Sequence, residues 1–255
     1  DNPLNEDGSA WLGNDEGPAA EVFLDNNLIA SHANVVFDAN GKLHLIGSEL
    51  LCYEDQLGDI YVMLYNDYVK SYIYDFDTDT FMKNDLFPQS VEPNDQEAML
   101  PWDMDEDGVV DEFTDEGAVA PIECWPIDWQ EYTDAFHENN FKIVANKDNS
   151  LMVAVWQDGL YNKYFLTGGD TDYEDWSEKT QIAIATSIDF GETWSAPMYL
   201  NSKEDDDNYV PELEGMTPRF VYPGDVIEDL GNDDYKLHFF FYDDNSFGSF
   251  NSPAA

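Results

Sequence analysis

Alternating carboxylates between residues 103 and 112 have the spacing of a calcium ligand set. Carboxylates occupy positions 1, 3, 5 and 9 of this segment, and Gly108 occupies position 6. Calcium takes six to eight hard oxygen ligands in flexible geometry, and alternate residues of a tight turn converge on one centre. The glycine permits the sharp bend, and a backbone carbonyl supplies the ligand at position 7. The sequence therefore predicts a Ca2+ site with the ligands Asp103, Asp105, Asp107, Val109 and Asp111.

The segment departs from an EF-hand loop at position 12, where that motif places a bidentate glutamate and this chain has Thr114. No helical periodicity flanks the segment. It resembles instead the Asp-x-Asp-x-Asp-Gly loops of dockerin-like and thrombospondin-type modules, and Glu112, Asp115, Glu116 or water would supply the remaining ligand. A chance cluster is the alternative in so acidic a chain, but three alternating aspartates followed by glycine favour the calcium site.

A second pattern combines hydrogen-bonding side chains with a glycine and a tryptophan. The string reads Ser187-x-Asp189-x-Gly191-x-Thr193-Trp194 and lies between two apolar stretches. Aspartate accepts hydrogen bonds from the backbone of its own turn, and glycine adopts the positive φ that closes such a turn. The tryptophan would cover the hydrophobic layer beneath the turn. The pattern therefore predicts a β-hairpin turn between strands at 180–185 and 195–200.

This string resembles the Asp-box of sialidase-type (BNR-repeat) β-propellers at all five defining positions. The resemblance implies a fold of antiparallel four-stranded blades, and it does not imply a reaction. A sialidase-type site needs three arginines to clamp the substrate carboxylate, because the planar guanidinium pairs with it bidentately. The chain contains a single arginine, Arg219. A sialidase activity would therefore need catalytic residues outside these 255 residues.

Short apolar stretches separated by Asx/Gly turns recur along the chain, as expected for all-β repeats. We expect about two and a half propeller-like blades, and closed propellers have about 4–8. The chain would then be part of a larger propeller, or its open edges would be covered by partners or other copies. A β-sandwich is the alternative. The expected units are an irregular entry segment at 1–27, a first blade at 28–87, an acidic insertion at 88–135, a second blade with the Asp-box at 136–200 and a partial third blade at 201–255.

Polar residues recur at matching positions of the three expected first strands. Alignment of these strands places Asn34, Lys142 and Arg219 together, and His32 lies two residues before Asn34 on the same strand face. First strands line the central channel of a propeller, so these four residues are candidates for a small polar or anionic ligand site. The alternative is that they are ordinary strand-end residues paired with nearby carboxylates.

The charge balance limits the partners of the chain. It has 55 acidic and 10 basic residues and a net charge of -45. Nucleic acid is excluded as a partner because a phosphate-binding surface needs clustered Lys and Arg. The acidity fits a surface that stays hydrated in a saline medium, divalent-cation binding, or both. No apolar run approaches the roughly 20 residues of a membrane helix, so membrane insertion is not expected.

Cys52 and Cys124 permit one disulfide, but two distant cysteines do not define a redox compartment. The chain begins at Asp1, which favours a processed protein or an excised segment. Together with the acidity, the Asp-box and the calcium-type loop, this indicates an extracellular or cell-surface location.

These observations predict a secreted, non-catalytic, calcium-binding β-propeller module that binds glycan or extracellular protein, with other copies of itself as a further partner. One alternative is a portion of a sialidase-like glycoside hydrolase. Another is a structural subunit of a surface layer or filament. The segment Trp125-Pro126-Ile127-Asp128-Trp129 is the expected aromatic platform for a sugar.

Overall fold

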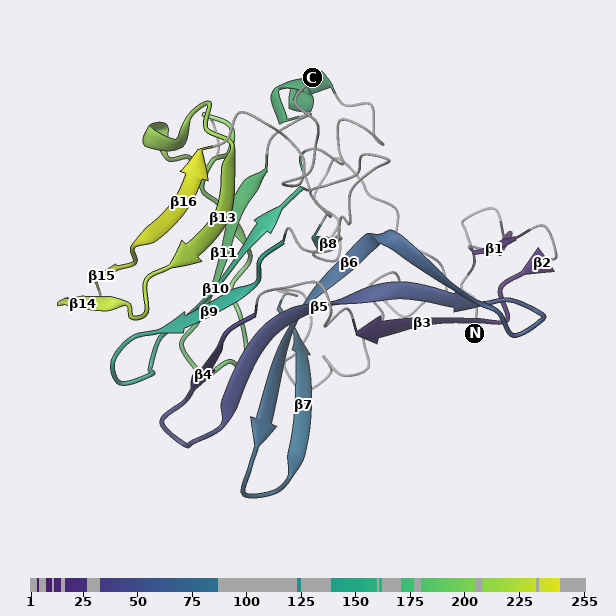
Figure 1. The fold of residues 1–255 in the computed structure, drawn as a ribbon, viewed down its shortest axis with the longest axis horizontal. Helices are drawn as coiled ribbons and strands as arrows, with labels where there is room; N and C mark the ends of the chain where they lie inside the picture. Colours follow the sequence, from purple (N-terminus) through teal and green to yellow (C-terminus); the bar gives the residue numbers. More distant parts are fainter. Residues whose placement is uncertain are drawn as a thin grey trace.

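The computed structural model describes residues 4, 8–10, 12–14, 17–26, 33–86, 123–124, 139–159, 161, 171–176, 180–204, 208–232 and 234–243. Within these residues the fold is all-β with antiparallel sheets, as Figure 1 shows. The helical elements that have defined bounds there are short 3-10 turns, η4 (Thr171–Trp176) and η5 (Pro211–Leu213). In the described part of the chain, no helix is both long enough and apolar enough to cross a membrane.

The first sheet is built around one long hairpin of β5 (Leu43–Glu54) and β6 (Ile60–Asp75). A register shift between Leu50 and Leu51 divides this hairpin into an inner and an outer half. In the inner half, β4 (Val35–Phe37) pairs with β5 and β7 (Thr80–Asp85) pairs with β6. The order β4-β5-β6-β7 is the four-stranded antiparallel unit expected from the sequence.

The outer half of the hairpin forms an arm that extends away from the rest of the molecule (Figure 1). There β3 (Glu21–Asn26) pairs with β5, and the small sheet of β1 (Gly13–Asn14) and β2 (Gly17–Pro18) lies at its end. Strands β1, β2 and β3 lie within the segment 1–27, for which the sequence predicted irregular structure. No glycine or proline interrupts the aromatic and β-branched residues of β6, so the strand continues.

The second sheet has the order β12-β11-β10-β9. Its strands are β9 (Lys142–Ala145), β10 (Met152–Asp158), β11 (Gln181–Ser187) and β12 (Met198–Tyr199). Every residue of β9 and β10 is buried, which means that both faces of the sheet are covered. This explains why β10 reads as a continuous apolar run instead of an alternating one.

The third sheet pairs β13 (Pro218–Pro223) with β16 (Phe239–Asp243). Between them the chain forms a hairpin of β14 (Glu228–Gly231) and β15 (Asp234–Lys236). Both hairpins lie within the segment 201–255, where the sequence predicted a partial third unit. A further short strand, β8 (Glu123–Cys124), lies in the insertion and pairs with β6.

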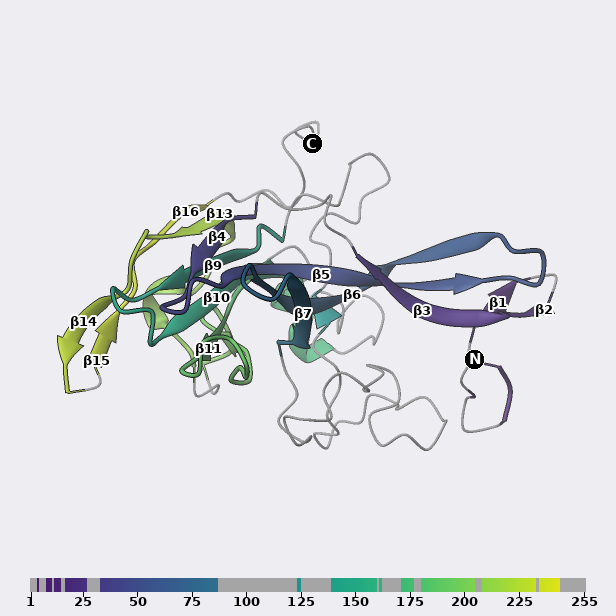
Figure 2. The ribbon, with the colours of Figure 1, turned by 90° about the horizontal axis from the view of Figure 1, so that it is seen from below.

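The three sheets stack face to face in chain order, with the second in the middle (Figures 1 and 2). Two hydrophobic cores lie between them. The first core joins Ile46 and Val69 of the first sheet to Ile143 and Trp156 of the second. The second core joins the opposite face of the second sheet to the third, through residues that include Val144, Val153, Val155, Val221, Phe239 and Phe241.

Two asparagine side chains tie each sheet to the next at its first strand. The Asn34 amide donates to the Ile143 carbonyl at 2.8 Å and accepts from the Ile143 N–H at 2.8 Å. The Asn140 amide donates to the Val221 carbonyl at 2.7 Å, and the Val221 N–H donates to Gln157 Oε1 at 3.0 Å. The first strands of the three sheets, β4, β9 and β13, are therefore linked by polar bonds as well as by apolar packing.

Replacing Asn34 tests how much its hydrogen bonds to Ile143 contribute to the free energy of unfolding. In Asn34→Ala the buried N–H and carbonyl of Ile143 lose their partners, so the free energy of unfolding should fall by about 1–3 kcal/mol. Urea unfolding would measure the change, with Asn40→Ala in the exposed β4–β5 turn as the control. Equal stability of the two variants would contradict the assignment.

Candidate functional site

The turn at 187–194 is closed by its own side chains. Ser187 Oγ donates to Asp189 Oδ1 at 2.7 Å and accepts from the Gly191 N–H at 2.8 Å. Asp189 in turn accepts from the Thr193 N–H at 2.9 Å and from the Thr193 hydroxyl at 2.5 Å. The backbone takes positive φ at Phe190 (63°) and Gly191 (79°). The hydrogen bonding expected of Asp189 and the positive φ expected of Gly191 are both confirmed.

The electrostatics of Asp189 follow from the same bonds. Burial alone would raise the pKa of its carboxyl, but the hydrogen bonds from Thr193 and Ser187 favour the ionised form and lower it below the ordinary value. Trp194, the last residue of the pattern, is 8% exposed and packs into the first core, as the sequence predicted. The motif residues therefore hold the turn together and anchor it in the interior.

The 187–194 turn docks on the first sheet. Asn84 Nδ2 donates to the carbonyl oxygens of Gly191 at 3.3 Å and Glu192 at 3.4 Å. A Cβ at Gly191 would lie 2.9 Å from His44 Nδ1 and 3.8 Å from Ile73 Cδ1, so a side chain would collide at this contact. The glycine is thus required twice, once by its φ and once by the approach of a neighbouring sheet.

Beneath this contact lies a buried pair of Asp38 and His44. His44 Nε2 lies 3.1 Å from Asp38 Oδ2, while Asp38 Oδ1 accepts from the N–H groups of Asn40 and Lys42. Since a carboxylate only accepts, Nε2 carries the proton and Nδ1 is the bare nitrogen. Burial lowers the pKa of His44, although the hydrogen bond and the charge of Asp38 act in the opposite direction. Asp38 thus holds the β4–β5 turn through the N–H groups of Asn40 and Lys42, and it bonds to the neutral imidazole of His44.

Lys142 lies at the end of the second core and is 5% exposed. Its Nζ donates to Asn140 Oδ1 at 2.7 Å and to the Phe141 carbonyl at 3.2 Å, and it lies 5.1 Å from the centre of the Tyr222 ring. Burial lowers the pKa of Lys142 from 10.5 to about 8. The aromatic face and the two oxygens stabilise the ammonium where water does not reach it.

The candidate ligand site from the sequence is only partly described. The structure places Lys142 beside Asn140 and Tyr222, and it bonds the Asn34 amide to the backbone of β9. His32 and the Arg219 side chain lie outside the described residues, although the Arg219 backbone pairs with Tyr242. The two described members, Asn34 and Lys142, each contact residues of the adjacent sheet.

An ionic cluster around the buried Glu49 was not predicted from the sequence. Glu49 is 1% exposed and lies 2.6 Å from Lys83 Nζ and 3.7 Å from Lys70 Nζ. The alternation of β5, β6 and β7 places all three on the face opposite the first core. One carboxylate thus holds two of the few cations of the chain, and spacing in the sequence does not reveal it because the residues come from three different strands.

The predicted calcium ligands Asp103, Asp105, Asp107, Val109 and Asp111 all lie outside the described residues, as does the segment 125–129. Among the residues that are described, no group of three or more His, Cys, Asp or Glu side chains has the arrangement of a metal site. Cys52 is a buried thiol, whose pKa is raised first by burial and then by the charge of Asp25.

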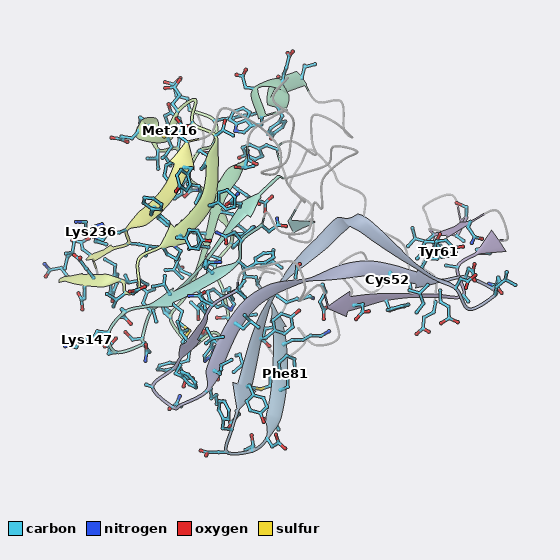
Figure 3. The ribbon with its side chains drawn as sticks, in the orientation of Figure 1. Cys52, Tyr61, Phe81, Lys147, Met216 and Lys236 are labelled. Atoms are coloured by element: carbon cyan, nitrogen blue, oxygen red, sulfur yellow. The ribbon has the colours of Figure 1, made fainter. Side chains whose placement is uncertain are left out.

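The two outer faces of the stack expose large apolar side chains. We define the first end face as Val35, Phe37, Phe76 and Phe81, which are 47%, 52%, 58% and 61% exposed. The second end face consists of Tyr222, Phe240 and Tyr242, which are 39%, 63% and 61% exposed. Figure 3 labels Phe81 on β7 of the first sheet and Lys236 at the end of β15, which follows the third sheet's first strand.

A scan against protein-family models gave no match to this chain, and a search of curated proteins also gave none.

Gly191→Ala should destabilise the protein more than Gly41→Ala. Both glycines have φ near 80°, so alanine at either position is strained by about 1–3 kcal/mol. Only at Gly191 would the new methyl group also collide with His44, because Gly41 has open space around it. Urea unfolding of both variants measures the difference, and equal losses would show that the close approach to His44 has no energetic weight.

His44 should make stability depend on pH below its ordinary pKa of 6.5. As pH falls through that value, the unfolded chain takes up a proton that the folded state, with its lowered pKa, does not. The free energy of unfolding of the native protein should therefore fall between about pH 6.5 and 5, and His44→Gln should lack this component. Urea unfolding at several pH values compares the two slopes. His238, exposed near Glu228, provides the control substitution His238→Gln. Parallel pH profiles for native protein and His44→Gln would contradict the assignment.

Proposed function

We propose that this chain is a non-catalytic, calcium-binding β-propeller-like module of an extracellular assembly that binds glycan or protein. The observation that carries the proposal is the stack of three antiparallel sheets, in which the first strands β4, β9 and β13 are joined in chain order. Successive blades of a propeller follow one another in this way around a channel lined by first strands. A two-sheet sandwich provides no place for the third layer.

The 187–194 turn supports the same interpretation. Its hydrogen bonds are internal, its tryptophan enters the first core, and its glycine contacts the neighbouring sheet. The side chains of Ser187, Asp189 and Thr193 thus make their hydrogen bonds within the turn and account for its folding. Together with the single arginine of the chain, this favours a binding module over a portion of a sialidase-like hydrolase.

Exposed aromatic side chains provide surfaces for a partner. Rings that present a flat apolar face with a polar edge stack on sugars and on protein side chains. The exposed rings of the two end faces also favour a second candidate function, a structural subunit of a surface layer or filament, because exposed apolar side chains promote association.

Calcium should stabilise the folded protein through the predicted loop. A ligand that binds only the folded state adds about 2.7 kcal/mol at a hundredfold excess over its dissociation constant. Thermal unfolding with calcium and then with excess chelator, at matched ionic strength, measures this effect. In Asp105→Ala/Asp107→Ala the gain in melting temperature should disappear.

The matched control is Asp205→Ala/Asp206→Ala, which removes the same charge from a different acidic run. This control should keep the calcium response. If calcium has no effect beyond that of ionic strength, the calcium part of the proposed function is wrong and the acidity serves solvation alone.

A further inference from the structure

We infer that Asn40 is a site of spontaneous covalent modification, at which the side-chain amide is lost through a cyclic imide and the β4–β5 turn acquires an aspartate or isoaspartate residue. The inference goes beyond the proposed function and does not rest on it. It concerns the turn at residues 37–44, all of which the structure describes.

The turn combines an accessible amide with an unhindered neighbour. The sequence contains a single Asn-Gly step, formed by Asn40 and Gly41, and both residues are exposed. Because glycine has no side chain, its backbone nitrogen meets little steric hindrance. A Cβ placed on Gly41 would have no other atom within 4 Å, so water and hydroxide reach this nitrogen from an open side. Asparagine is among the thermolabile residues of proteins, and the surroundings of Asn40 favour its loss.

The other asparagines provide internal references. Asn149 and Asn232 also lie in hairpin turns, but Ser150 and Asp233 follow them, and both of these residues carry side chains. Four further asparagines are buried and do not precede glycine: Asn139, Asn140, Asn146 and Asn201. We therefore expect Asn40 to react first among the described asparagines.

The reaction consists of two balanced steps. Hydroxide removes the amide proton of Gly41, and the nitrogen then attacks Asn40 Cγ. The new N–Cγ bond replaces the Cγ–Nδ2 bond, and ammonia leaves with a proton from water. Water next adds to one of the two imide carbonyls, so one water is consumed for each ammonia released. Opening at Cγ gives aspartate, whereas opening at the main-chain carbonyl of residue 40 gives isoaspartate, whose backbone is one methylene longer.

The hydrogen bonds of the turn control how often the attack occurs. The Gly41 N–H donates to the Asp38 carbonyl at 3.1 Å, and Asp38 Oδ1 accepts from the N–H groups of Asn40 at 2.8 Å and Lys42 at 2.9 Å. The Gly41 nitrogen must leave the Asp38 carbonyl before it can reach Cγ. Exposed turns open locally while the sheets stay folded. The modification therefore occurs in the folded protein, more slowly than in an unstructured peptide.

Isoaspartate at this position would alter the contact between the first two sheets. An extra methylene between Asp38 and Lys42 separates the two N–H groups that share Asp38 Oδ1. Oδ2 of the same carboxylate lies 3.1 Å from His44 Nε2, and His44 lies at the close approach of Gly191. A displaced Asp38 would thus disturb the buried imidazole against which the 187–194 turn packs.

Timed incubation of the full chain at mildly alkaline pH, followed by peptide mapping with mass spectrometry, tests the assignment. Asn40 should convert from amide to acid faster than Asn149 and Asn232, at a rate that rises with hydroxide concentration, and an isoaspartate-specific methyltransferase should label the product. In Gly41→Ala the rate should fall by about tenfold, equivalent to about 1.36 kcal/mol in the activation free energy. Conversion of Asn149 or Asn232 as fast as Asn40, or an unchanged rate in Gly41→Ala, would overturn the assignment.

Urea unfolding of the separated forms tests the structural consequence. The isoaspartate form should unfold at lower urea concentration than the native protein. Asn40→Asp adds the same charge without the extra methylene, so it should stay close to the native midpoint. Asn40→Gln keeps a neutral amide and is the matched control, which should neither accept the methyl label at this position nor lose stability there during incubation. Equal stability of the isoaspartate form and Asn40→Asp would contradict an effect on the His44 contact. None of these results depends on calcium or on a partner.

Discussion

Burial of both faces of the second sheet is the constraint on which the rest of the structure depends. Strands β9 and β10 have no solvent-facing side, so neither forms a stable sheet unless a neighbour covers each face. The first sheet covers one side through Ile46 and Val69, and the third covers the other through Val221 and Phe239. The stability of the second sheet thus depends on the sheets that cover its two faces.

The polar residues of the interior follow from that constraint. Stacked sheets bring backbone groups of first strands together where no ladder satisfies them, and buried unpaired amides are costly. Asn34 and Asn140 satisfy these groups with side-chain amides, which mimic the backbone. Asp38 and His44 likewise bond to each other in the interior, and the ammonium of Lys142 bonds to the Asn140 side chain. Asn34, a candidate site residue in the sequence, is in this way a link between two sheets.

Local features could be predicted from the sequence, and contacts between distant strands could not. The Asp-box spacing predicted the hydrogen bonds of Asp189 and the positive φ of Gly191, because turn chemistry is determined within a few residues. The all-β class followed from short apolar stretches between Asx/Gly turns. By contrast, the approach of His44 to Gly191 and the cluster of Glu49 with Lys70 and Lys83 depend on how strands pair and sheets dock.

The separation in sequence between bonded partners has a consequence for the order in which the fold assembles. Apart from β8, strands within each sheet are near neighbours along the chain, but Asn34 and Ile143 are 109 residues apart, and Asn84 and Gly191 are 107 apart. Contacts between residues so far apart in sequence close large loops. The chain loses conformational entropy when such a loop closes, before the new contact contributes any stability. Hairpins therefore form early and the docking of sheets forms late. Among the described contacts, we therefore expect the seam that contains His44 and Gly191 to exclude water late in folding, and the nascent sheets to be open to proteases and misassembly before it does.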